Sequence, residues 1–80
     1  MTFGPWAFDI SSAERLARLR GMRALALMHC RSHSDFIDSL HRAETDEAAL
    51  PVAFHHLEHL PALRRRHLLA SYCQLLGRPR

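Results

Sequence analysis

Apolar residues recur along most of the chain at the three- and four-residue spacing of a helix with one buried face. Over about residues 12–31 this spacing predicts a first helix whose apolar face holds Leu16, Leu19, Ala26, Leu27 and Cys30. Ser11 comes just before it and Glu14 follows three residues later, which is the spacing of a capping box. Met22, Leu25 and Met28 lie outside this face, so we expect the helix to be covered on two sides, by the rest of the fold or by a second copy.

The same pattern predicts two helices in the middle of the chain. A short helix covers about residues 35–43, with Ser34 as its cap. Its inward residues are Phe36, Ile37, Leu40 and Ala43. The next helix begins at Asp46 and is kinked by Pro51, or it begins later with Pro51 in its first turn. Its apolar face consists of Leu50, Ala53, Phe54, Leu57 and Leu60.

The two ends of the chain are predicted to differ. A last helix follows Pro61, runs to about Leu76 and stops at Gly77, which leaves residues 77–80 as a loose tail. Its wide apolar face holds Leu68, Leu69, Tyr72, Cys73, Leu75 and Leu76. At the other end, Gly4 and Pro5 prevent an early α-helix, so residues 1–10 are predicted to form an extended arm. Its apolar side chains favour an arm that covers the domain's own core over one that docks on a partner.

These elements define one all-α domain over residues 1–80, a small bundle of three to four helices. Strand-favouring residues are scarce, since Val52 is the only valine. A chain of 80 residues has a thin core, and we therefore expect a homodimer. The residues expected at the dimer interface are Met22, Leu25, Met28, Leu68, Tyr72 and Leu75.

Charge and composition narrow the possible functions only slightly. All eleven basic residues are arginine, but a net charge of +3 is too small to indicate nucleic-acid binding by itself. The run Arg64–Arg66 lies early in a helix, where the helix dipole disfavours cations. We therefore expect these arginines to bind an acidic partner surface, a phosphate, or acidic residues of the fold itself. We see no secretory signal and no membrane-spanning run, and we expect a cytoplasmic protein.

Histidines supply the sharpest chemical pattern. His55, His56 and His59 fall on the side of their helix opposite its apolar face, and pairs of them have a spacing that could chelate zinc or nickel. With Cys30 they form the pattern C-x24-H-x3-H, which resembles the ligand spacing of the small helical copper- and nickel-sensing repressors. The chain departs from that family at Thr45–Pro51, which interrupts what should be one long helix. We expect no cofactor, with a zinc or nickel site of Cys30, His55 and His59 as the alternative.

No catalytic set is visible. Ser71 and Cys73 lie inside a helix, and Cys30 diverges from the adjacent His29 by about 100° around the helix axis. We therefore expect not an enzyme but a protein–protein interaction module that binds and modulates, for example inhibits, a partner protein. The alternative is a nucleic-acid-binding transcriptional regulator, which a His/Cys metal site could make metal-responsive. The residues expected to bind a partner are Trp6, Phe8, His55, His56, His59, Arg64, Arg65 and Arg66.

Overall fold

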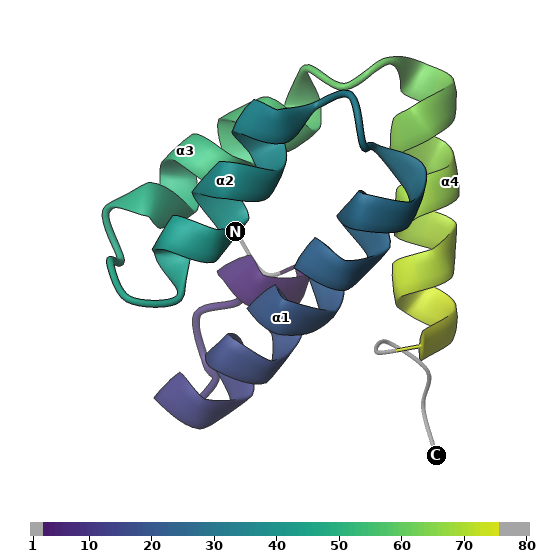
Figure 1. Ribbon diagram of the computed structural model, residues 1–80. Coiled ribbons are helices and arrows are strands. Elements are labelled where there is room, and N and C mark those ends of the chain that lie inside the picture. The colour runs from purple at the N-terminus through teal and green to yellow at the C-terminus, as the bar shows by residue number, and fades with distance from the viewer. Residues whose placement is uncertain (1–2, 76–80) are drawn as a thin grey trace.

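A computed structural model describes residues 3–75, and over this range the chain is all-helical, with four α-helices and no strand (Figure 1). The elements are the 3₁₀ helix η1 (Gly4–Trp6) and the helices α1 (Ser12–His29), α2 (Ser34–Ala43), α3 (Ala49–Glu58) and α4 (Ala62–Leu75). The predicted all-α bundle is confirmed. The predicted helix end at Leu76, the stop at Gly77 and the tail at residues 77–80 lie outside the described residues. None of the described helices is both long enough and apolar enough to cross a membrane.

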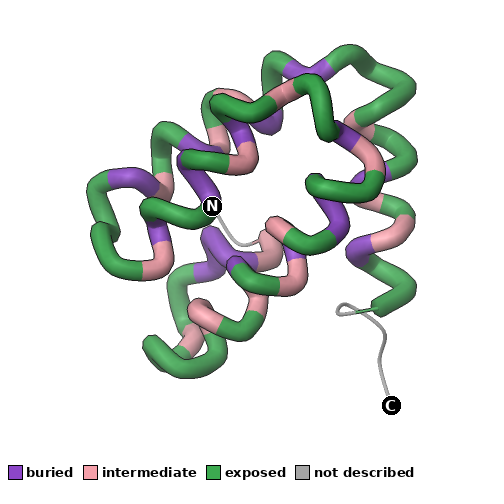
Figure 2. Tube along the Cα trace, viewed as in Figure 1, coloured by how far each residue is buried: buried purple, intermediate pink, exposed green. Residues whose placement is uncertain are grey.

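α1 packs against both α2 and α4, and α3 packs against α2. Figure 1 shows α2 and α3 as an antiparallel hairpin, with α1 beside α2 and α4 on the far side of α1. Although α3 and α4 are neighbours in the chain, they do not pack along one another. Buried positions recur on all four helices between exposed stretches (Figure 2).

Helix α1 begins where the sequence predicts. The Ser11 hydroxyl oxygen accepts a hydrogen bond from the Glu14 amide at 3.1 Å, which satisfies one of the free N–H groups of the first turn. The carboxylate of Glu14 pairs with Arg18 one turn later, at 2.8 Å. The helix ends at His29, about two residues earlier than predicted.

The observed starts of α2 and α3 test the predicted Ser34 cap and the predicted place of Pro51. α2 begins at Ser34 itself, with His33 as the N-cap residue and no side-chain capping bond, so the predicted Ser34 cap is wrong. α3 begins at Ala49, which places Pro51 in its first turn, where a missing N–H breaks no helix bond. The Asp46 carboxylate accepts from the Ala48 amide at 3.0 Å just before this start.

The core is aliphatic and aromatic, and it draws on every helix. The side chains buried most completely include Leu19, Met22, Cys30, Phe36, Leu40 and Leu68. The second apolar side of α1 is covered within the chain, because Met22 and Leu25 are both buried there. Three residues of the predicted apolar faces are not in the core. Leu27 is 49% exposed, and Cys73 and Leu75 are exposed as well, since α1 and α4 each turn that side toward solvent.

The N-terminal arm covers the core of its own chain. It is not extended throughout, because residues Gly4–Trp6 form the turn η1. Gly4 has a positive φ of 52°, and a Cβ there would lie 3.1 Å from the Tyr72 hydroxyl, so both backbone and packing require glycine. Arg15 donates to the carbonyls of Pro5 (2.7 Å) and Ala7 (2.9 Å), which fixes the arm against α1.

Candidate functional site

An open apolar groove lies between α3, α4 and the N-terminal arm. It has a volume of about 470 Å³ and is lined by Phe3, Phe54, Leu57, Glu58, Arg65 and Leu69. Three of its apolar residues, Phe3, Phe54 and Leu69, are only partly buried, although they pack against the core. We call this feature the apolar groove.

Buried Trp6 fixes the aromatic walls of the apolar groove. The Phe54 ring meets Trp6 edge to face, with 5.3 Å between ring centroids, and Phe3 stacks on Trp6 at 6.2 Å. The indole N–H of Trp6 donates to the Leu50 carbonyl at 2.8 Å, which ties the arm to α3. These contacts fix the arm and Phe54 as the aromatic side of the groove.

The rim of the apolar groove carries one charge of each sign. The Arg65 guanidinium donates to the backbone carbonyl of Glu58 at 2.8 Å, at the last residue of α3. A cation there satisfies a free carbonyl and interacts favourably with the helix dipole. Glu58 itself is exposed and Arg65 is half-buried, so both charges are accessible from the groove.

The arginines on either side of Arg65 differ in their contacts. Arg64 donates to the His29 carbonyl at the end of α1, at 2.8 Å. Within residues 3–75, Arg66 is exposed and makes no hydrogen bond or ion pair. Of the three explanations for this run, the fold itself accounts for Arg64 and Arg65, although the groups they bind are helix carbonyls and not acidic side chains.

Arginines of α1 are also used inside the chain. Arg18 donates to the Gly4 carbonyl at 3.1 Å and so adds to the contacts of Arg15 with the arm. Arg20 and Arg23 approach the carboxylate of Glu44 at 3.5 and 3.2 Å, and that side chain is only 9% exposed. These two ion pairs of Glu44 join the end of α2 to α1.

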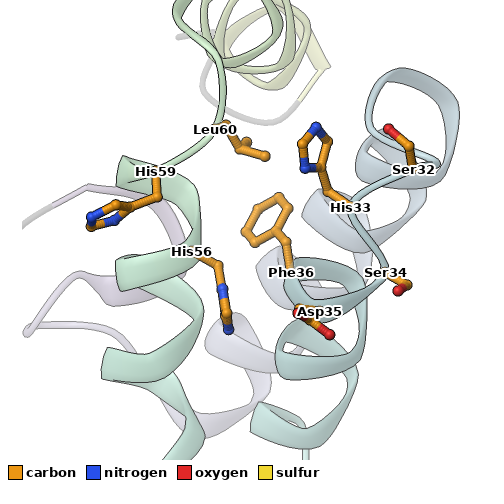
Figure 3. Close-up of a pocket in the computed structure, with 8 residues that line it drawn as sticks. All are labelled: Ser32, His33, Ser34, Asp35, Phe36, His56, His59 and Leu60. Carbon is orange, nitrogen blue, oxygen red and sulfur yellow. The ribbon is translucent and has the colours of Figure 1, made fainter.

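The predicted histidine surface lies at a second, polar pocket. His56 and His59 line an open space of about 180 Å³ together with His33 and residues at the start of α2. Figure 3 shows the rings of His33, His56 and His59 pointing in different directions and not toward a common point. His59 Nδ1 donates to the His55 carbonyl at 2.8 Å. The outward placement is confirmed for His55 and His59, which are exposed, whereas His56 is half-buried.

The alternative metal ligands are not brought together. Within residues 3–75, no three His, Cys, Asp or Glu side chains gather so that they could hold a metal ion, which separates Cys30 from His55 and His59. Cys30 is fully buried, and this desolvation raises the pKa of its thiol, against a smaller lowering by Arg64.

Burial also corrects the predicted interaction residues. Met22, Leu25, Leu68 and Tyr72 lie inside the single chain, so of the expected dimer interface only Met28 and Leu75 are exposed. Trp6 is likewise buried by its own chain, and it cannot present its ring to a partner without release of the arm. Phe8, by contrast, is 70% exposed.

A further hydrogen bond between α1 and α4 was not predicted from the sequence. The Ser71 hydroxyl lies 3.0 Å from His29 Nε2. Forty-two positions separate the two residues, and nothing in their local patterns links them. The pair lines neither the apolar groove nor the polar pocket.

Sequence reasoning missed the apolar groove itself. Phe54, Leu57 and Leu69 have the spacing of ordinary core residues, and the pattern alone does not show that α4 turns away from α3.

Comparisons of this chain with protein-family models, with curated proteins and with solved structures give no match.

Proposed function

We propose that this chain is a small helical protein–protein interaction module that binds a partner protein in the apolar groove and modulates it, for example by inhibition. The observation that carries the proposal is the groove between α3 and α4, with apolar walls and one accessible charge of each sign. Pockets of this kind, in which a few polar groups orient an apolar anchor, are typical of binding sites.

The surface beyond the groove supports the same choice. Large apolar side chains that are half or more exposed, or nearly so, are spread over the arm and all helices but α2: Phe8, Leu27, Met28, Val52, Leu63 and Leu75. Single exposed apolar residues are common in any protein. Together with an open apolar groove, however, they give the surface apolar area that a protein partner can cover.

The contacts of the arginines are the reason to prefer a protein partner to nucleic acid. Phosphate binding depends on guanidinium groups that are free to reach a polyanion. Arg15, Arg18, Arg64 and Arg65 instead donate to backbone carbonyls, while Arg23 pairs with Glu44. A homodimer, a cytoplasmic location and the absence of catalytic activity belong to this proposal.

The test compares two matched substitutions on adjacent residues of α4. Leu69→Glu places a charge on the groove wall, whereas Ala70→Glu places the same charge on an exposed position next to it. Wild type and Ala70→Glu should capture the same protein from a lysate of the source cells, and Leu69→Glu should lose it while keeping a helical circular-dichroism spectrum. Capture that is equal for all three chains, or no capture by wild type, would contradict the proposal.

A further inference from the structure

We propose that the apolar groove of one copy receives Phe8 of a second copy, with Asp9 of that copy next to Arg65. This inference rests on the proposed function only in treating the groove as a binding surface. It names an occupant that the chain itself supplies.

The first observation is that the rest of its own chain leaves Phe8 largely uncovered. Its side chain is 70% exposed, although the neighbouring Trp6 and Ala7 are buried. An aromatic ring left in water at this position invites cover from elsewhere.

The second observation is that Phe8 cannot fill the groove of its own chain. The Ala7 carbonyl just before it accepts from Arg15 at 2.9 Å, and Ser11, three residues after it, caps α1 through the Glu14 amide. The short segment between these two fixed points holds Phe8 outside the groove, whose arm-derived wall is Phe3. Only another molecule can bring this ring to it.

The third observation is the match in chemistry. The groove offers apolar walls for a ring, and the half-buried guanidinium of Arg65 lies on its rim. Asp9 is exposed and adjacent to Phe8 in the chain, so an inserted ring brings a carboxylate to the rim, where it should face Arg65 and stay away from the carboxylate of Glu58. Each copy has one groove and one Phe8-Asp9 pair, and a two-fold dimer satisfies both grooves at once.

Self-association of this kind covers the surface that a partner protein would use. The dimer is then the resting form of the module, and partner binding and dimerisation compete for the same apolar walls. Loss of Phe8 should therefore remove the dimer and leave the groove free for the partner.

Sedimentation velocity over a range of concentrations tests the dimer. Wild type should show a monomer–dimer equilibrium, and Phe8→Ala should weaken it by about tenfold or more, as for an aromatic anchor at an interface. Val52→Ala truncates another exposed apolar residue and should leave the equilibrium unchanged. A wild type that stays monomeric throughout, or equal dimerisation of all three chains, would overturn the inference.

Cross-linking then tests which surfaces meet. In a Cys73→Ser background, which removes the exposed thiol, one chain carries Asp9→Cys and a second carries Arg65→Cys, so that both keep the Phe8 ring. Mixing and mild oxidation should give the mixed disulfide in high yield, whereas Val52→Cys in place of Arg65→Cys should not. Equal yields for both pairings would also overturn the inference.

The two proposals fail in different ways. If Phe8→Ala loses the dimer and still captures the partner protein, both stand. If wild type is monomeric but Leu69→Glu loses capture, only the self-association fails. If the dimer forms as described and no protein is captured, only the partner-binding function fails.

Discussion

The contacts that α3 makes with its two neighbours in the chain differ sharply. Against α2 it forms an antiparallel hairpin whose buried residues include Phe36, Leu40, Ala53 and Leu57. It does not pack along α4, and the arm and Arg65 connect the two helices on either side of the open groove. Both connections are short, so proximity in the chain does not decide which helices pack together. α4 leaves α3 at Pro61 and packs on α1 instead.

The largest effect should come from removing the bridge between α3 and α4. Trp6→Ala deletes a buried ring and the hydrogen bond to the Leu50 carbonyl, with an expected loss of about 3–5 kcal/mol in the free energy of unfolding. Urea denaturation followed by circular dichroism measures it.

Such a loss approaches the whole stability of a small domain, so a milder variant accompanies it. Trp6→Phe keeps a ring but loses the N–H donor, and it should cost about 1–2 kcal/mol. If Trp6→Ala were as stable as wild type, the arm would not be the element that joins α3 to α4.

A matched pair of leucine truncations compares the two neighbours of α3 directly. Leu40→Ala opens a cavity at a fully buried position in α2, at an expected cost of about 3 kcal/mol. Leu69→Ala removes a partly buried side chain from a groove that is already open, at an expected cost of about 1 kcal/mol. Equal losses in urea denaturation would show that the region between α3 and α4 is packed as tightly as the hairpin.

Weakening the hydrogen bonds between Arg15 and the arm should have a smaller effect on the free energy of unfolding. Arg15→Lys replaces the guanidinium nitrogen Nη1, which donates to both the Pro5 and the Ala7 carbonyl, with an ammonium group on a shorter side chain, at a cost of about 1–2 kcal/mol. The amides of Trp6 and Ala7, which bond within the arm, should exchange hydrogen faster. Arg20→Lys is the control, because that side chain is 63% exposed. Unchanged exchange in Arg15→Lys would mean that apolar contacts alone hold the arm.

The smallest effect concerns two adjacent arginines of α4. Arg65→Ala removes the donor to the Glu58 carbonyl and should cost about 0.5–1 kcal/mol. Arg66→Ala changes an exposed residue and should stay within about 0.5 kcal/mol of wild type. The difference between the two midpoints in urea measures how much the cap on α3 contributes, and a reversed order would contradict the assigned contact.

The helices were predictable because local signals determine them. The Ser11 cap, the two prolines and the apolar spacing are all read within a few residues, and they gave four helices and most of the core. Errors fell where the outcome depends on distant neighbours. The exposure of Leu27 and Cys73 is set by how far α2 and α4 extend over α1, which spacing on one helix does not show.

The candidate site was less predictable for the same reason. Arg64 and Arg65 were recognised as misplaced cations, yet the carbonyls that they bind belong to α1 and α3 and become visible only in three dimensions. The outward side of the histidines followed from the helical period, but the different directions of the His33, His56 and His59 rings did not. The apolar groove depends on the divergence of α3 and α4, for which the sequence carries no local sign.

Trp6 is the only tryptophan of the chain, and it lies at the contact between the arm and α3. Its emission is therefore an intrinsic optical reporter of whether the arm is docked. A ligand that enters the groove next to its ring will change the quantum yield, and detachment of the arm will shift the spectrum to the red. Occupancy and opening can thus be followed in the unlabelled natural chain, in real time.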